Sequence, residues 1–208
     1  MSIAVIGTGN MGAGLVRLLA SKGQDVVVGA RDPAKAAALA AEIGHNVQGG
    51  GIAAAFRLAD TVILALPFGS AADIFKAAGD VTGKIIIDIS NPLNADFQSL
   101  SIGHSTSAAE QIQGLAPTAK VVKAFNTIFA QLLPVEARNG KTLQVFVAAD
   151  DADAKVKVST LIGQLGFEAV DAGALTSSRD LEPIGMMNIR FGFFLGKGPT
   201  VAPMWVQA

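Results

Sequence analysis

A glycine-rich pattern near the start of the chain could hold a phosphate group. It reads Gly7-Thr8-Gly9-Asn10-Met11-Gly12. Between a strand and a helix, the first glycine permits a tight turn, the second lets the backbone approach a pyrophosphate and the third lets the helix pack closely on the strand. The N–H groups that begin the helix would point at the phosphates. The pattern alone is weak and also fits a turn without a ligand, but its setting between an apolar run and an amphipathic stretch favours dinucleotide binding.

The residues after the second expected strand indicate which dinucleotide would bind. NAD enzymes place a carboxylate there, about 20 residues beyond the glycines, to bind the ribose 2′-hydroxyl. This chain has Ala30 and Arg31 instead, and a guanidinium can pair with a 2′-phosphate, with Lys35 adding a second positive charge. Asp32 could be a displaced NAD determinant, but its place before Pro33 indicates a helix cap. The sequence therefore favours NADP over NAD.

Three further segments should border the nicotinamide, because open α/β sheets bind ligands beyond the carboxyl ends of their strands. They are Leu66-Pro67-Phe68, Ser90-Asn91-Pro92 and Phe125-Asn126-Thr127. Asn126 could hold the carboxamide or the hydride acceptor, or equally it could satisfy nearby backbone groups. The Asn91–Pro92 bond could be cis, although a trans bond is the usual case.

Side chains that could act as acids, bases or metal ligands are scarce. The chain has no Tyr and no Cys, which excludes a Tyr–Lys reductase site and thiolate chemistry. Its two His leave little scope for a multi-histidine metal centre. Lys123 could serve as an acid, but a basic residue that marks the edge of the sheet, or a structural salt bridge, is the commoner role. His45 is expected at the surface, and His104 is a weak candidate. We therefore assign no catalytic residue and no metal site, a pattern that suits hydride transfer between two cofactors.

Composition narrows the class of protein further. The 208 residues, at roughly 150 per domain, correspond to one domain with an appendage. Hydrophobic residues make up 50% and charged residues 16%, so much surface must be buried, and contacts between subunits could bury part of it. The net charge of −1 argues against nucleic acid as a partner. We see no signal peptide and no membrane span, and the absence of Cys fits a cytoplasmic location.

Apolar runs alternate with stretches of helical spacing, which predicts a parallel sheet wrapped by crossover helices. Strands are expected at residues 2–6, 25–29, near 47, 61–65, 84–88 and 120–124. Helices are expected from about 11 to 23 and at 33–43, 52–58 and 107–113. A strand, a helix and a strand should follow at 142–148, 151–165 and 167–170, with a terminal helix from about 177.

The predicted fold class is therefore α/β, a doubly wound Rossmann-type parallel sheet with a small C-terminal α/β extension. We expect an NADP-binding Rossmann domain at 1–140 and a C-terminal lobe with the terminal helix at 141–208, packed on the same core. The terminal helix is a candidate for homodimer contacts, with packing on its own sheet as the alternative. Pro183 would be tolerated only near the start of this helix.

Several of these segments together resemble a known family. They are the glycine pattern with Asn10-Met11, Val28-Gly29-Ala30-Arg31, Lys123-Ala124-Phe125-Asn126-Thr127, and Asp171-Ala172-Gly173 leading to Ser178-Arg179. The chain resembles the NADP oxidoreductases that depend on the deazaflavin coenzyme F420, and it is similar to the cytosolic domain of STEAP-type metalloreductases. The resemblance spans nearly the whole chain and is most specific at residues 123–127.

The resemblance implies NADPH binding, hydride transfer to a flavin-like acceptor, and a homodimer. At matching positions, the pyrophosphate contacts would be Thr8, Asn10 and Met11. The 2′-phosphate contacts would be Ala30, Arg31 and Lys35. The residues bordering the nicotinamide would be Leu66, Pro67, Asn91 and Pro92. Archaeal deazaflavin enzymes carry His where this chain and STEAP-type domains carry Asn, at Asn126, so FMN, FAD or another small acceptor stays open beside coenzyme F420.

Three functions therefore compete. The first is an NADPH-dependent oxidoreductase with a flavin or deazaflavin acceptor. The second is a sensor or assembly module that binds NADP without catalysis. The third, a reductase of a small organic substrate, is disfavoured because the large helical domain of related two-domain enzymes is missing.

Overall fold

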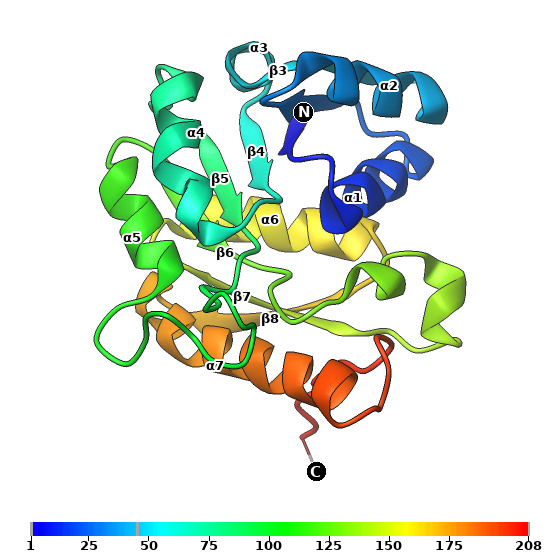
Figure 1. Cartoon of the computed structure of the whole chain (residues 1–208), viewed down its shortest axis with the longest axis vertical. Helices are drawn as coiled ribbons and strands as arrows, with labels where there is room; N and C mark the ends of the chain where they lie inside the picture. The colour runs from blue at the N-terminus through cyan, green and yellow to red at the C-terminus, as the bar shows by residue number, and fades with distance from the viewer. Residues whose placement is uncertain (1, 45, 208) are drawn as a thin grey trace.

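Short apolar runs form the strands of one sheet, and helices cover both of its faces (Figure 1). The computed structural model describes residues 2–44 and 46–207. The first six strands are β1 (Ile3–Ile6), β2 (Val26–Ala30), β3 (Val47–Gly51), β4 (Thr61–Leu64), β5 (Ile85–Asp88) and β6 (Lys120–Lys123). They run parallel in the order β3-β2-β1-β4-β5-β6. The order reverses between β1 and β4, the place where doubly wound sheets bind ligands.

Alternate residues of the central strands enter two separate cores. Helices α1 (Asn10–Ser21), α2 (Pro33–Ile43) and α6 (Ala152–Gln164) cover one face of the sheet. Helices α3 (Ile52–Leu58), α4 (Ala71–Ala78) and α5 (Ala108–Leu115) cover the other. In β1, Ile3 and Val5 enter the first core while Ala4 and Ile6 enter the second. The strand is therefore apolar at every position, as expected of a strand buried on both faces.

Side-chain caps mark the start of α2, α5 and α6. Asp32 caps α2 by accepting a hydrogen bond from the Ala34 N–H at 3.0 Å, and Pro33 takes the first helical position. Ser107 caps α5 in the same way. The sequence analysis missed α4, although Ile74 and Phe75 of this helix pack on the second core. It also missed the short 3-10 helices η1 (Phe68–Ser70), η2 (Ala130–Leu132) and η3 (Val135–Arg138).

The sheet continues past β6 with a change of direction. Strand β7 (Gln144–Ala149) runs antiparallel to β6, and β8 (Glu168–Gly173) runs parallel to β7. The fold class predicted from the sequence is confirmed. The division into two domains at residue 140 stays a prediction, since one sheet spans both parts.

The terminal helix α7 (Ser178–Ile189) packs on the β7–β8 extension and leads into a π-helical turn, η5 (Arg190–Phe194). Leu181 of α7 forms a small core with Phe146 and Ala148 of β7. Packing of this helix on its own sheet is thus confirmed, whereas its use in a dimer stays a prediction. Pro183 lies inside α7 and not in the first turn, which corrects our expectation.

In the described part of the chain, no helix has the length and apolar character needed to cross a membrane.

Candidate functional site

Gly7 and Gly12 allow the end of β1, the end of β4 and the start of α1 to lie in close contact. Gly7 has a φ of +122°, and its N–H donates to the Gly29 carbonyl at 2.9 Å. A Cβ on Gly7 would collide with the backbone oxygen of Ala65, and one on Gly12 would collide with the backbone oxygen of Gly7. The tight turn and the close packing predicted for these two glycines are both present.

The first turn of α1 is open to a ligand. Its N-cap residue is Gly9, which is exposed and supplies no side-chain cap. A Cβ on Gly9 would meet nothing within 4 Å. The side chains of Asp32, Ser107 and Asp151, in contrast, cap α2, α5 and α6. The positive end of the α1 dipole is therefore free to bind an anion.

A cavity of about 220 Å³ lies in front of this turn. It brings together seven of the predicted cofactor-binding residues: Gly7, Thr8, Gly9, Ala30, Arg31, Lys35 and Leu66. Asp32 also lines the cavity, but its carboxylate caps α2, so the capping interpretation is confirmed. The side chains of Arg31 and Lys35 are exposed and make no hydrogen bond or ion pair with residues 2–44 or 46–207.

The other three residues of the glycine pattern lie outside this cavity. Asn10 lines a separate, open depression of about 750 Å³ between α1 and the segment 130–136. Met11 is half-buried and packs against the core beneath α1, and Gly12 is buried. Whether Asn10 and Met11 contact a pyrophosphate stays a prediction.

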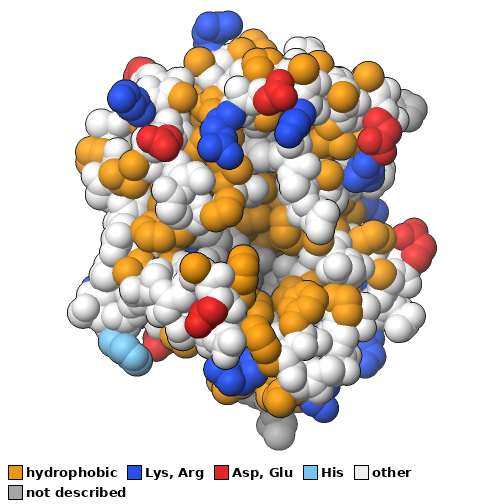
Figure 2. Space-filling model, in the orientation of Figure 1, with side chains coloured by type: hydrophobic (Ala, Val, Ile, Leu, Met, Phe, Trp, Pro, Cys, Tyr) orange, Lys and Arg blue, Asp and Glu red, His pale blue; other side chains and the backbone are white. Residues whose placement is uncertain are grey.

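Leu66 connects the cavity with the ends of β4 and β5. Beyond it, Leu66 and Pro67 line a narrow gap together with Phe68, Asp88 and Ser90. Figure 2 shows a hollow across the middle of this face, lined largely by hydrophobic side chains, with Lys and Arg side chains on the surface above it. The hollow lies between the N-terminal helices and α7 as they are arranged in Figure 1.

Asn91 and Asn126 hold each other at the ends of β5 and β6. The Asn91 side-chain amide donates to the Asn126 carbonyl at 2.8 Å, and the Asn126 amide donates to Asn91 Oδ1 at 3.0 Å and to the Leu181 carbonyl at 2.8 Å. Both N–H groups of the Asn126 side chain are thus used within the protein, whereas its Oδ1 is buried and has no hydrogen-bond partner among the described residues. A contact between Asn126 and the carboxamide or the hydride acceptor stays a prediction. Pro92 is buried next to Asn91, and the bond between them is trans.

The backbone that places Asn126 is strained. Phe125 has a φ of +60°, is buried, and packs edge-on against Phe167 with 5.7 Å between ring centroids. A left-handed conformation in a bulky residue costs about 1–3 kcal/mol and is found mostly where function requires it. No sequence pattern announced this conformation, because glycine is the residue that normally marks it.

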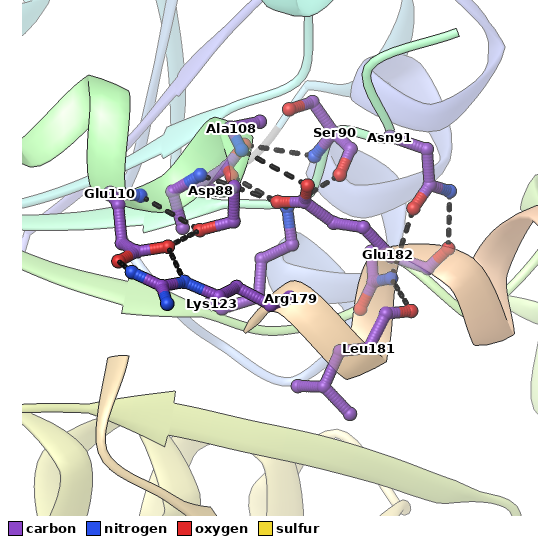
Figure 3. A network of polar contacts seen from close by, with 12 residues as sticks. Asp88, Ser90, Asn91, Ala108, Glu110, Lys123, Arg179, Leu181 and Glu182 are labelled. Carbon is purple, nitrogen blue, oxygen red and sulfur yellow. Dashed lines mark hydrogen bonds and ion pairs between the residues drawn. The ribbon is translucent and has the colours of Figure 1, made fainter. Parts of the chain in front are cut away.

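Lys123 forms a buried ion cluster and is not free to act as an acid (Figure 3). Its ammonium contacts Asp88 Oδ2 at 2.7 Å and Glu182 Oε1 at 2.8 Å, and it donates to the Ser90 carbonyl at 2.6 Å. The structural salt bridge expected as the commoner role is confirmed. Sequence analysis missed both Asp88 and Glu182. A signal was available for Asp88, because Asp88 and Lys123 are oppositely charged residues at the ends of two neighbouring apolar strands.

A second ion pair joins α5 to α7 on the same side of the sheet. Arg179 donates two hydrogen bonds to the Glu110 carboxylate, at 2.9 and 2.6 Å. The hydrogen bond from Arg179, together with that from Ser107, lowers the pKa of Glu110 below its ordinary value of 4.5 despite partial burial. The same bond raises the pKa of Arg179. Glu110 therefore stays ionised at neutral pH and ties the two helices together.

His104 does not contribute to this site. His104 is exposed in the irregular segment between β5 and α5, with a φ of +61°. His45 lies outside the described residues.

Known proteins resemble both the sequence and the fold. The family model of NADP oxidoreductase, coenzyme F420-dependent, matches residues 2–92. A solved structure from Arthrobacter sp. FB24, provisionally named an F420-dependent NADP reductase, is 34% identical, covers 100% of both chains and has a TM-score of 0.90. The F420-dependent NADP reductase of Methanothermobacter marburgensis is 30% identical over 200 residues, covering 88% of this chain and 89% of that protein.

A longer relative matches over a similar part of this chain. Metalloreductase STEAP3 of Rattus norvegicus is 31% identical over 185 residues, which are 88% of this chain and 36% of that protein. The chain thus spans little more than a third of that metalloreductase. It spans most of the archaeal reductase, with the same fold as the Arthrobacter protein. The chain therefore belongs to the family of NADP oxidoreductases dependent on coenzyme F420.

Proposed function

We propose that this protein transfers a hydride between NADP(H) and a flavin or deazaflavin acceptor such as coenzyme F420, FMN or FAD. One observation carries the NADP part of the proposal. The uncapped start of α1 and the side chains of Arg31 and Lys35 face one cavity, and neither side chain is paired with a described residue. Such an arrangement suits a ligand with a pyrophosphate and a further phosphate.

The residues present fit this cofactor sterically as well. Gly9 leaves open space where a side chain would block a phosphate, and Leu66 leads from the cavity toward the ends of β4 and β5. Bound NADPH would supply the hydride, which leaves C4 of its dihydronicotinamide ring with both electrons, and one proton from solvent balances the reduction of the acceptor.

The engaged side chains at the strand ends favour a cofactor as the acceptor. In the described structure, Lys123 and Asn126 donate every side-chain N–H group to protein acceptors, and Asn91 donates one to the Asn126 carbonyl. Reduction of a carbonyl needs a positioned proton donor, whereas a flavin-like ring accepts a hydride directly. The acceptor ring would lie in the apolar hollow of Figure 2.

A rapid-mixing experiment tests the activity. NADPH is mixed with coenzyme F420, FMN, FAD and riboflavin in turn, and the nicotinamide absorbance is followed. We expect oxidation of NADPH with at least one of these acceptors. Binding of NADPH without oxidation by any of them would favour the non-catalytic sensor. Rapid turnover with an imine or a β-hydroxy acid would favour the reductase of a small organic substrate.

We also propose a cytoplasmic homodimer joined through the C-terminal helix. The support is an apolar surface on α7 and the tail after it, which includes the exposed side chains of Met187, Phe191 and Trp205. Neither nucleic acid nor a membrane is part of the proposal.

A further inference from the structure

The buried ion cluster of Lys123, Asp88 and Glu182 joins elements that lie far apart in the sequence. Asp88 ends β5 and Lys123 ends β6, and the two are partners in the register of the parallel pair. Register partners point to the same face of a sheet, so the two side chains meet there. Glu182 comes from α7, 59 residues after Lys123. All three side chains are 0–1% exposed.

Further bonds tie the cluster to the backbone around it. Glu182 Oε2 accepts from the Ala108 N–H at 3.0 Å, and Oε1 accepts from the Ala109 N–H at 3.3 Å, so the start of α5 is included. Asp88 Oδ1 accepts from the Ser90 N–H at 2.9 Å. The three donors of the Lys123 ammonium have the three acceptors described above. Every charged side-chain atom of the cluster therefore has a hydrogen-bond partner.

The same part of α7 also holds the two asparagines at the strand ends. Leu181, next to Glu182, offers its carbonyl to Asn126. Gly185 lies nearly one helical turn after Glu182. Because it has no Cβ, it leaves room for the Asn91 side-chain amide, which would collide with a Cβ at that position. Ser90 connects the two groups, because it bonds to the cluster and precedes Asn91 in the chain. Movement of Glu182 would therefore move Asn91 and Asn126.

A gain in folding stability does not by itself explain why the protein contains this buried ion cluster. Removing charges from water is costly, and replacing a buried ion network by apolar residues of similar volume is often neutral or stabilising. A satisfied network does fix one arrangement of the elements it joins, whereas apolar contacts tolerate small shifts. Such a shift at a reacting centre, of about 1 Å, can slow a reaction by roughly 100-fold.

We infer that Lys123, Asp88 and Glu182 are positioning residues that clamp α7 to the ends of β5 and β6, and so set the walls between which nicotinamide and acceptor meet. This inference rests on the proposed function. It assigns the cluster to the hydride-transfer step and not to NADP affinity, since in the described structure no hydrogen bond joins the cluster to the glycine turn or to α2.

The test compares wild type with Glu182→Gln, which keeps the shape of the side chain. The rate of NADPH oxidation is measured by rapid mixing with FMN and with coenzyme F420, the isotope effect with NADPH deuterated at C4, and NADPH binding by calorimetry. Exchange of the Ala108 and Ala109 amide hydrogens reports on the cluster itself. We expect a transfer rate lower by roughly 10- to 100-fold, an isotope effect at least as large as in wild type, NADPH affinity within about twofold, and faster amide exchange.

Two further variants separate positioning from general loss of stability. Leu161→Ala creates a cavity in α6, on the opposite face of the sheet, and should lower the thermal midpoint while leaving the transfer rate unchanged. The triple variant Lys123→Met, Asp88→Asn, Glu182→Gln removes every charge of the cluster and keeps oxygen acceptors for the Ser90 and Ala108 N–H groups. It should fold with a midpoint near that of wild type and still transfer hydride slowly.

Wild-type transfer rates in folded Glu182→Gln or in the triple variant would overturn the inference while leaving the proposed function intact. A loss of rate that equals the unfolded fraction, with an unchanged isotope effect, would also overturn it. If wild type oxidises NADPH with neither acceptor nor with FAD or riboflavin, the proposed function fails and the inference fails with it.

Discussion

Two neighbouring residues after β2 carry opposite charges, and their different contacts determine what each can bind. The Asp32 carboxylate accepts the Ala34 N–H at the start of α2, because Pro33 places it as the cap. Arg31 lines the same cavity, and its guanidinium has no partner in the described part of the chain. In this cavity, the guanidinium of Arg31 would therefore be free to bind a phosphate, whereas the carboxylate of Asp32 already accepts the Ala34 N–H.

Arg31→Ala should weaken NADPH binding much more than NADH binding. A charge-assisted hydrogen bond contributes about 1.5–3 kcal/mol, so loss of the guanidinium should raise the dissociation constant for NADPH roughly 10- to 100-fold. NADH lacks the 2′-phosphate, and its affinity should change by less than about threefold. Calorimetric titration with each dinucleotide measures both values.

Arg57→Ala is the matched control for that experiment. Arg57 is an exposed arginine in the last turn of α3 and does not line the cavity. Its removal changes the net charge by the same amount and should leave both affinities as they are. An equal loss of NADPH and NADH affinity in Arg31→Ala would contradict a role for Arg31 at the 2′-phosphate.

At the scale of elements, Glu110 and Arg179 link α5 to α7 outside the buried ion cluster. The hydrogen bonds from Arg179 and Ser107 lower the pKa of Glu110. A carboxyl group whose pKa is lower in the folded state stabilises the fold above its unfolded pKa. That contribution is lost as the pH falls through the folded pKa, because the proton is then bound in both states.

Glu110→Gln should therefore destabilise the protein at pH 7 and have less effect in acid. The pair is partly exposed, and we expect a difference of about 0.5–1 kcal/mol in the free energy of unfolding at pH 7. The difference should shrink as the pH drops below 4.5, the ordinary pKa of a glutamate. This difference in the free energy of unfolding is measured by urea unfolding of wild type and variant at a series of pH values from roughly 3 to 7, which includes the range in which carboxylates titrate.

Asp60→Asn serves as the control for this pH dependence. Asp60 is exposed, and its carboxylate forms no ion pair with the residues that the structure describes. Its replacement should leave the stability curve parallel to that of wild type. A Glu110→Gln curve that is also parallel at every pH would show that the ion pair does not stabilise the fold.

Local signals predicted most elements, and contacts between distant segments account for what was missed. Apolar runs gave the strands, and Asp32-Pro33 with Gly44 gave both ends of α2. Helix α4 was missed although Ile74 and Phe75, which pack on the core, were an available signal. The seven cavity residues come from segments whose patterns are local, whereas the bond between Lys123 and Glu182 spans 59 residues and no local pattern encodes it.

In the molecule as a whole, most of the large exposed apolar side chains lie in the C-terminal part. A groove of about 390 Å³ runs between α7 and the tail, lined by residues that include Ile184, Met187, Phe191 and Trp205. Trp205 is 67% exposed. Exposed apolar patches of this kind mark interaction sites, and a two-fold dimer would cover the same patch on both copies.

Met187→Asp should weaken the proposed dimer. A carboxylate placed in an apolar interface loses its hydration, and we expect the dimer dissociation constant to rise about tenfold or more. Sedimentation over a range of concentrations measures it. Leu58→Asp is the control, since Leu58 on α3 is 50% exposed and Met187 is 52% exposed. A monomeric wild type, or a variant that dimerises like wild type, would contradict the proposal.

The residues that line the cavity and the residues of the α7 wall come from different parts of the sequence. Every residue lining the dinucleotide cavity lies between positions 6 and 74, so that cavity is encoded before α6 begins. The wall formed by α7 depends on Glu182 and Gly185, which come much later in the sequence. The residues that line this cavity therefore leave the ribosome well before the residues of the wall beside it.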